Sequence, residues 1–155
     1  MRILELFSGT GSVGNVCRRL GCTVTSLDRD LPADLQMDIL DWDYTSLPPR
    51  SFDFIWASPP CTEYSVAKTV GVRKLEEANA IVQRTLEIIN YFDPPYWIIE
   101  NPQTGLLKNQ PFMTNLPMMT WITVNTECPT ANALDSGTTS PTGSPSLYVR
   151  RIVAT

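Results

Sequence analysis

Short apolar runs alternate with amphipathic stretches over the first two thirds of the chain. Apolar runs of strand length occupy residues 3–8, 23–28, 52–58 and 96–101, and a weaker one lies near residues 35–40. Residues 73–92 instead carry apolar side chains three and four positions apart, which predicts an amphipathic helix that ends before Pro94 and Pro95. Strands and helices in alternation are typical of an α/β domain with an open, mostly parallel sheet.

Polar residues and glycines follow the predicted strands. The turn GTGSVG comes after the first strand and leads into a short helix through Val16 and Leu20. Carboxylates come at the ends of later strands, at Asp28, Asp38 and Glu100. Because ligands of open parallel sheets bind at the carboxyl ends of the strands, we expect one site to gather these residues.

The amino-acid composition limits which catalytic groups and metal sites the protein can have. The 155 residues are 43% hydrophobic, which is enough for one domain with one core. There is no histidine, which removes the commonest general base and transition-metal ligand, and we expect no metal. The cysteines at positions 17, 22, 61 and 128 form no CxxC pair, as expected of free thiols in a reducing compartment.

The net charge and the hydropathy limit which partners and which cellular location the sequence predicts. The net charge of −4 argues mildly against a nucleic-acid partner, because phosphate binding requires lysine and arginine. The N-terminus does not resemble a signal peptide, and no apolar run approaches the roughly 18 residues that a membrane span needs. These features predict an intracellular protein, cytoplasmic or nuclear, that is neither secreted nor bound to a membrane.

Residues 119–155 differ in composition from the rest. Their central part, NTECPTANALDSGTTSPTGSPS, is rich in threonine, serine, proline and glycine and has no helical or strand period. Such a composition is typical of a disordered segment. We therefore expect a folded domain at residues 1–118, an irregular tail at 119–155, and a sheet whose C-terminal strands are missing.

The glycine turn and the carboxylate after it suit a nucleotide-like cofactor. Gly9, Gly11 and Gly14 give the pattern GxGxxG between a strand and a helix, where glycine lets the backbone approach a ligand closely. Asp28, at the end of the next strand, could accept two ribose hydroxyl groups. The pattern alone fits NAD, FAD or S-adenosylmethionine about equally, and a tight turn without a ligand is the alternative.

Three aspartates follow the third predicted strand in the stretch MDILDWD. Asp38 could accept a hydrogen bond from the amino group of an adenine ring, and a solvated loop aspartate is an equally good interpretation. For Asp41 and Asp43 the solvated loop is the favoured interpretation.

Cys61 lies just past a predicted strand, behind two prolines in the stretch ASPPCTEYS. A structural cysteine is usually buried within an element, whereas this one lies at the ligand edge in a stiffened loop, as suits a nucleophile. Without a histidine, its activation requires a cation, a helix terminus or the substrate complex. Glu100, between Ile99 and the Asn-Pro that follows, is costly to bury without a partner, which favours a functional role. A thiol and a carboxylate on neighbouring strand ends could attack and polarise one small ring.

Together these stretches resemble the C5-cytosine DNA methyltransferase family over residues 2–118. ELFSGTGSVG is similar to the first family motif, SLDRD and MDIL to the second and third, ASPPC to the fourth and IIENP to the sixth, in the same order and spacing. The forms SPPCTEYS and ENPQTG are most similar to the small viral and phage members. Each motif alone is weak, and their conjunction favours this family.

The resemblance implies a Rossmann-like fold of the S-adenosylmethionine-dependent methyltransferases and a DNA (cytosine-5-)-methyltransferase activity. Cys61 would attack C6 of a cytosine flipped out of DNA, Glu100 would hold the base at N3, and the methyl group would pass to C5. Pro60 and Asn101 complete the implied catalytic set. The implied cofactor-binding residues are Phe7, Ser8, Gly9, Thr10, Gly11, Asp28, Arg29, Asp38, Ile39, Ser58 and Pro59. Residues 62–74 form a locally basic loop that could close over the DNA or remain a solvated surface loop.

The family pattern breaks after Pro117, where an arginine-bearing eighth motif, a recognition region and closing strands should follow. If the bases that encode residues 119–137 are read one base out of register, the genetic code permits the sequence DxDYCKYGxPYRKRTRxW. Its first aspartate is forced by the codons of Met119 and Thr120. The permitted sequence resembles the eighth motif of small family members. We therefore hypothesise a one-base frameshift near residues 117–119, whose in-frame version would add about five lysines and arginines and ease the charge objection.

Three alternatives stay open on the sequence. The chain could be an inactive fragment that at most binds S-adenosylmethionine or a partner chain, because the missing motifs would contact the catalytic site and grip DNA. A nicotinamide-dependent oxidoreductase would explain the glycine turn but neither Cys61 nor Glu100. An amino-methylating enzyme is disfavoured because its motif ends in an aromatic residue after Pro-Pro, where this chain has Cys61.

Overall fold

The computed structural model describes residues 1–68, 71–120 and 145–151, with the backbone alone for residues 118–120 and 145–151. Its centre is a seven-stranded sheet in the order β3-β2-β1-β4-β5-β7-β6. The strands are β1 (Arg2–Leu6), β2 (Thr23–Asp28), β3 (Leu35–Gln36), β4 (Phe54–Ala57), β5 (Tyr96–Pro102), β6 (Met118–Thr120) and β7 (Pro145–Arg151).

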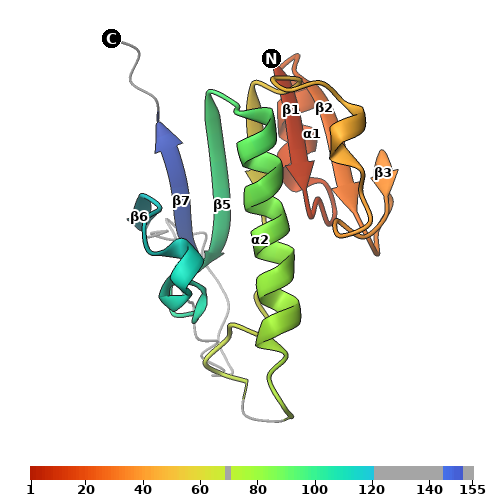
Figure 1. Cartoon of the computed structure of the whole chain (residues 1–155). Helices are drawn as coiled ribbons and strands as arrows, with labels where there is room; N and C mark the ends of the chain where they lie inside the picture. Colours follow the sequence, from red (N-terminus) through yellow and green to blue (C-terminus); the bar gives the residue numbers. More distant parts are fainter. Residues whose placement is uncertain (69–70, 121–144, 152–155) are drawn as a thin grey trace, which may run out of the picture.

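The five N-terminal strands run parallel, and their carboxyl ends meet at one edge of the sheet (Figure 1). The register places Leu6 of β1 beside Leu27 of β2 and Ala57 of β4, and Ala57 beside Ile99 of β5. The segments that follow β1, β2, β4 and β5 therefore gather at this edge, where the glycines and carboxylates of the sequence were expected to meet.

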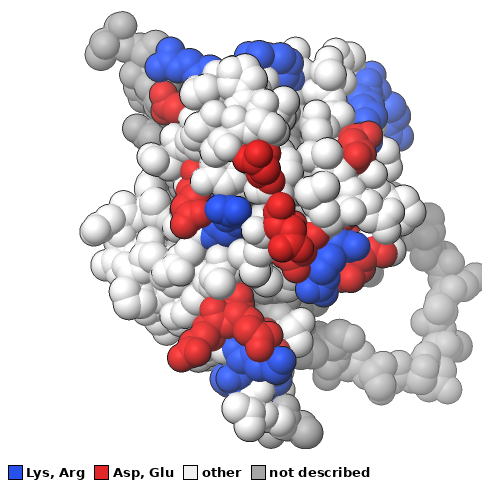
Figure 2. Space-filling model, turned by 45° about the vertical axis from the view of Figure 1, so that its right-hand side comes forward, with Lys and Arg blue, Asp and Glu red and all other residues white. Residues whose placement is uncertain are grey.

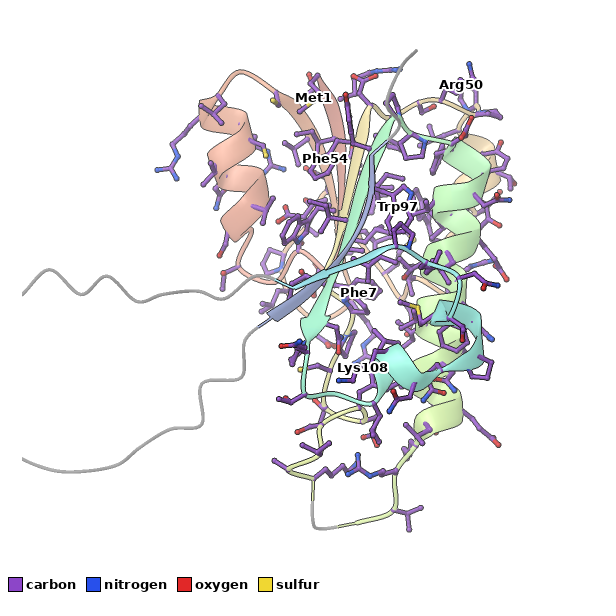
Figure 3. The ribbon with its side chains drawn as sticks, turned by 90° about the vertical axis from the view of Figure 1, so that its left-hand side faces the viewer. Met1, Phe7, Arg50, Phe54, Trp97 and Lys108 are labelled. Carbon is purple, nitrogen blue, oxygen red and sulfur yellow. The ribbon has the colours of Figure 1, made fainter. Side chains whose placement is uncertain are left out.

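Helices α1 (Ser12–Arg19) and α2 (Leu75–Phe92) cover opposite faces of the sheet, as the edge-on view in Figure 3 shows. The strands beneath α2 bury alternate residues, including Ile55 in β4 and Trp97 and Ile99 in β5. The helix contributes a matching stripe of buried side chains: Ala78, Val82, Thr85, Ile88, Ile89 and Phe92. This packing forms the main core and holds in place the strand ends that carry the site.

Local residues set the end of α2. Asp93 takes a left-handed conformation with φ of 43° after the last turn, and Pro94 and Pro95 prevent the helix from continuing. Near this end, Phe92 meets Phe52 edge to face with ring centroids 4.9 Å apart. Three short 3-10 turns complete the described chain: η1 (Tyr44–Ser46), η2 (Leu107–Asn109) and η3 (Pro111–Met113). No helix in the described parts is both long and apolar enough to cross a membrane.

Three strands are shorter than their apolar runs predict: β1, β3 and β4, which spans Phe54–Ala57 where the run covers residues 52–58. β1 ends at Leu6, because Phe7 has a left-handed φ of 59° that is incompatible with an extended strand. β3 contains only two residues, because the rest of the run at 35–40 leaves the sheet. Ile39 in this segment is buried. In β1 and β3 the residues lost from the strand belong to the ligand edge.

The expectation that the C-terminal strands are missing is wrong for the described residues. β7 pairs antiparallel with β5 from Tyr96↔Arg151 to Pro102↔Pro145, and β6 pairs with β7 at the edge of the sheet. Residues 147–149, Leu-Tyr-Val, have the aromatic and β-branched character of a strand, which the average composition of the tail concealed. The rest of the predicted irregular tail, at 121–144 and 152–155, lies outside the described residues.

Candidate active site

The chain between β1 and α1 forms a tight turn at the carboxyl edge of the sheet. Phe7, Gly9 and Gly11 have left-handed backbone angles, with φ of 59°, 54° and 73°. Glycine adopts such angles without strain, whereas Phe7 does so at a cost of about 1–3 kcal/mol. A β-carbon built on Gly9 would meet no atom within 4 Å, so there is open space beside the backbone of the turn.

Asp28, at the end of β2, fastens this turn to the sheet. Its Oδ2 accepts from the Gly9 N–H at 2.8 Å, and its Oδ1 accepts from the N–H groups of Asp30 and Leu31 at 2.9 Å each. Burial alone would raise the pKa of Asp28, but the donors at Leu31, Gly9 and Asp30 together lower that pKa below its ordinary value. A carboxylate offers about four acceptor positions, so one is left for a ligand hydroxyl, rather than the two expected from the sequence.

A pocket at the ends of β1, β2 and β4 brings together residues from four of the sequence motifs. This strand-end pocket is lined by Phe7, Leu27, Asp28, Arg29, Asp30, Met37, Asp38, Ile39, Pro60 and Ile81. Asp38 accepts from the backbone N–H of Leu40 at 2.9 Å and lies 3.6 Å from the guanidinium of Arg29. Apolar side chains and carboxylates in one pocket suit a flat ring that carries amino or hydroxyl donors.

A second pocket, the glycine-turn pocket, adjoins the first motif. Its lining includes four predicted cofactor residues: Ser8, Gly9, Thr10 and Gly11. Two other predicted cofactor residues, Ser58 and Pro59, line neither pocket. The Ser58 hydroxyl accepts from the Trp56 Nε1–H at 2.8 Å, and the carbonyl of buried Pro59 accepts from Asn101, so both support the end of β4 instead.

Cys61 follows β4 and is exposed at the carboxyl edge. Its loop is held on both sides, because Asn101 Nδ2 donates to the Pro59 carbonyl at 3.1 Å and the Tyr64 N–H donates to the Cys61 carbonyl at 3.0 Å. Asn101 is 1% exposed and extends from the neighbouring strand, β5. The thiol therefore sits on a backbone that is tied to the strand of Glu100.

Glu100 lies in β5, one position before Asn101, and its side chain is half-buried. Burial raises the pKa of the Glu100 carboxyl above its ordinary value of 4.5. A carboxyl with a raised pKa keeps its proton more readily and can donate a hydrogen bond to a ring nitrogen. Because Ala57 of β4 stands opposite Ile99 of β5, Cys61 and Glu100 extend from adjacent strand ends.

The loop after the exposed thiol is held by its own charged residues. Glu63 accepts from Lys68 Nζ at 2.6 Å and from the backbone N–H of Lys74 at 2.8 Å. Arg73 donates to the carbonyls of Glu63, Ser65 and Lys68. Two of the three cations of this loop are thus engaged inside it. In the described parts of the chain, no three acidic or cysteine side chains converge as metal ligands.

A buried carboxylate supports the glycine turn from within the sheet. Glu5 of β1 is 2% exposed, its Oε1 accepts from the Gly14 N–H at 3.0 Å, and its Oε2 has no hydrogen-bond partner among the described residues. Gly14 belongs to α1, and a β-carbon on it would overlap Glu5 Oε2. The third glycine of GxGxxG is therefore required by close helix–strand packing.

Replacing Gly14 by alanine is expected to destabilise the fold by about 1–3 kcal/mol, because Glu5 must move and lose its hydrogen bond. The direction of this change in the free energy of unfolding is informative, since Gly→Ala inside a helix ordinarily stabilises the helix by about 1 kcal/mol. Urea unfolding measures the change, with Val16→Ala on the exposed side of α1 as the control. A Gly14→Ala variant as stable as the wild type would contradict the packing described for Glu5.

Two residues that shape the site were not predicted. Ile81 of α2 lines the strand-end pocket, and Tyr64 is fully buried with its hydroxyl bonded to Asn79. The helical spacing of residues 73–92 held a signal for Ile81, which lies next to the buried Val82. Tyr64 stands in a polar stretch, TEYS, which by itself indicates an exposed loop.

Comparison with known proteins identifies the family. The family model of C-5 cytosine-specific DNA methylases matches residues 1–115. The chain belongs to this family. A protein of Frog virus 3 (isolate Goorha) described as a probable DNA (cytosine-5)-methyltransferase is 39% identical over 131 residues, which cover 76% of this methylase-family chain and 60% of the viral protein. The chain thus spans less than two thirds of the length of this relative.

Two solved structures share the fold of this methylase-family chain. A protein described as a DNA modification methyltransferase encoded within a prophage (E. coli) matches with a TM-score of 0.64 and 15% identity, over 96% of this chain and 46% of that one. A SAM-dependent methyltransferase from Archaeoglobus fulgidus matches with a TM-score of 0.58 and 12% identity, over 96% of this chain and 84% of that one. The predicted Rossmann-like methyltransferase fold is therefore confirmed.

Proposed function

We propose that this chain transfers a methyl group from S-adenosylmethionine to C5 of cytosine in DNA, through a covalent bond between Cys61 and C6 of the base. The placement of Cys61 and Glu100 on adjacent strand ends carries the proposal. Pro60, the residue before the thiol, itself lines the strand-end pocket, so nucleophile and cofactor would be neighbours. A nicotinamide-dependent oxidoreductase would use the pocket but would leave the thiol and the carboxyl without a role.

The two pockets fit the parts of S-adenosylmethionine, which supplies an electrophilic methyl group on a sulfonium sulfur. In the strand-end pocket, Phe7 and Ile39 would contact the adenine ring, and Asp38 would accept from its amino group. Asp28 retains one acceptor position for a ribose hydroxyl. The open backbone of the glycine turn would face the amino-acid end.

Cys61 acts as the nucleophile in this proposal. Its thiolate sulfur forms a bond to C6, and the electron pair of the C5–C6 double bond makes C5 nucleophilic. The tie from Asn101 to the Pro59 carbonyl fixes the loop, so less ordering is needed when the base arrives. Once C5 carries the methyl group, its proton passes to a base, such as a water molecule, the C5–C6 double bond re-forms, and the Cys61 sulfur leaves as a thiolate.

Glu100 acts on the opposite side of the same ring. Attack at C6 places negative charge on the ring, and a protonated Glu100 carboxyl stabilises it by donating to N3. Partial burial favours this role, because it raises the pKa of Glu100 and so keeps the proton available. Asn101, next in the strand, holds the nucleophile loop in place by its bond to Pro59.

The proposed substrate requires a flipped base, because the face of a cytosine ring is covered by its neighbours in the DNA stack. The surface seen in Figure 2 intersperses acidic and basic side chains and has no broad basic patch. Lys108 is exposed, lies toward the same end of the molecule as Phe7 (Figure 3), and forms no ion pair among the described residues. Most of the described lysines and arginines are paired with carboxylates of the chain, so few are free to contact DNA. A DNA substrate implies an intracellular location, in the cytoplasm or the nucleus.

An inactive fragment that at most binds S-adenosylmethionine or a partner chain is the second candidate. The family match ends at residue 115, and the viral relative aligns with 76% of the 155 residues, which is about 118. The end of the family match at residue 115 is compatible with a frameshift near residues 117–119 that replaces the arginine-bearing motif with unrelated sequence. The pockets would then be retained while turnover is lost.

Sequencing the gene around codon 118 tests the frameshift hypothesis. We expect the shifted frame to stay open across residues 119–137 and to encode the YGxPxR pattern with its arginines. A stop codon in that stretch, or a frame without the arginines, would refute it.

Replacing Asp28 by alanine is expected to weaken S-adenosylmethionine binding about 10- to 100-fold, because it removes a charged acceptor and releases the Gly9 N–H that shapes the turn. Isothermal titration calorimetry of the full chain measures the effect. Asp41→Ala, which removes an exposed carboxylate outside the pocket, is the matched control. Equal affinity of the Asp28 variant and the wild type would contradict the assigned cofactor site.

A further inference from the structure

A closed ring of hydrogen bonds lies beneath the nucleophile loop and joins three segments of the chain. It runs through Tyr64 in the loop, Asn79 in the first turns of α2, and Gln110 and Leu106 in the segment after β5. None of these four residues lines the strand-end pocket or the glycine-turn pocket. The role of this ring is therefore separate from cofactor contact.

Each bond of the ring is within ordinary hydrogen-bond distance. The Tyr64 hydroxyl donates to Asn79 Oδ1 at 2.8 Å, and Asn79 Nδ2 donates to Gln110 Oε1 at 3.1 Å. Gln110 Nε2 donates to the Leu106 carbonyl at 3.2 Å. The Leu106 N–H donates to the Tyr64 carbonyl at 2.9 Å and closes the ring.

The ring uses the oxygen and the nitrogen of both side-chain amides, so neither amide can rotate without breaking two bonds. Tyr64 is 0% exposed, which makes a lost bond costly. Burial raises the pKa of Tyr64 to about 12, so its hydroxyl stays protonated and remains a donor at every pH at which the fold operates.

The ring sets the position of the thiol relative to the carboxyl. The Tyr64 N–H donates to the Cys61 carbonyl, so the anchored tyrosine fixes the first turn after the thiol. Leu106 follows the turn in which the Gly105 N–H donates to the Pro102 carbonyl, directly after Glu100 and Asn101. One ring thus ties the segment after Cys61 to the strand of Glu100, while the Asn101–Pro59 bond ties the segment before Cys61 to the same strand.

We propose that Tyr64, Asn79 and Gln110 are positioning residues that hold Cys61 in register with Glu100 for attack on the base. This proposal rests on the proposed methyl transfer for its kinetic consequence, but the ring itself is testable without substrate. A ring with a structural role alone would contribute to global stability and would not affect turnover once stability is restored.

Tyr64→Phe breaks the ring with the loss of one oxygen atom. We expect the Leu106 amide to exchange with deuterium at least about tenfold faster, while amides of β1 follow only the change in global stability. Gln110→Ala breaks the ring on its other side and should give the same local effect if Tyr64→Phe folds poorly. Tyr91→Phe is the matched control, because its hydroxyl bonds the Leu47 carbonyl at the far end of the same helix.

The kinetic readout separates positioning from stability. We expect Tyr64→Phe to lower kcat for methyl transfer about tenfold while the Kd for S-adenosylmethionine stays within about twofold. The triple variant Tyr64→Phe/Asn79→Leu/Gln110→Leu replaces all three side-chain partners of the ring by apolar groups, so it should recover stability without recovering kcat.

Two results would overturn the proposal: exchange at Leu106 that changes no more than at β1, or a triple variant whose kcat returns with its stability. Absence of methyl transfer in the wild type would instead count against the proposed function. The exchange experiment would then still decide whether the ring holds the loop to the strand of Glu100.

Discussion

Replacing Cys61 by serine is expected to lower methyl transfer to cytosine by at least about 10⁴-fold, because a serine hydroxyl is a far weaker nucleophile toward C6 than a thiolate. The affinity for S-adenosylmethionine should stay within about twofold, since the pocket is lined by Pro60 and not by the thiol. Incorporation of a labelled methyl group measures the first effect, and calorimetry measures the second.

The matched control for this variant is Cys22→Ser, which removes a partly buried thiol after α1, away from both pockets. It should leave transfer and cofactor affinity unchanged. A Cys61→Ser variant that loses cofactor affinity in proportion to activity would show that the thiol supports the pocket, contrary to the role proposed for it.

Replacing Glu100 by glutamine is expected to lower methyl transfer about 10²- to 10⁴-fold, because the amide can donate to N3 but cannot transfer a proton to it. Cofactor affinity should again stay close to that of the wild type. Glu76→Gln, an exposed carboxyl in the first turn of α2, is the matched control and should transfer at the wild-type rate.

The same substitution should change how stability depends on pH. Burial raises the pKa of Glu100 in the folded chain above 4.5, so the folded state binds this proton more tightly than the unfolded state does. The wild type should therefore lose stability as pH rises from about the ordinary pKa through the raised one. Glu100→Gln should remove this decline and be the more stable protein at neutral pH. A decline that persists in urea unfolding of the variant would assign it to another group.

The parts of the fold that follow from local pattern could be predicted from the sequence. β2 and β5 lie within a residue of their predicted ends, and α2 begins two residues later than predicted. Their apolar spacing and terminal residues carry the information directly. β7 was missed because its pairing with β5 is a long-range contact, and a short apolar run inside a Ser/Thr/Pro-rich segment gives no local sign of a partner.

The candidate site could be predicted from the sequence where a motif requires a particular backbone conformation. Gly9 and Asp28 were expected together, and the bond between them closes the turn. Backbone donors at Asp30 and Leu31 occupy Oδ1 of Asp28, and sequence spacing does not reveal such local competition for the acceptor positions of this carboxylate.

Supporting residues were harder to predict than reactive ones. Asn79 and Gln110 lie on surface-like positions in sequence, and their function depends on a ring that closes only in three dimensions. Ser58 and Pro59, which the family resemblance implies as cofactor residues, each bond a group of β4 or β5, and the sequence did not indicate this supporting contact. Packing decides which residues meet across strands, and a single sequence does not reveal that packing.

The central claim is that Cys61 attacks C6 so that C5 of cytosine receives the methyl group. The most direct measurement incubates the full chain with DNA and S-adenosylmethionine labelled in the methyl group, then identifies the labelled nucleoside after digestion. The account predicts label in 5-methylcytosine alone, and none with Cys61→Ser. Label on the exocyclic nitrogen, label that persists without Cys61, or no label at all would contradict it, and the last result would favour the inactive fragment.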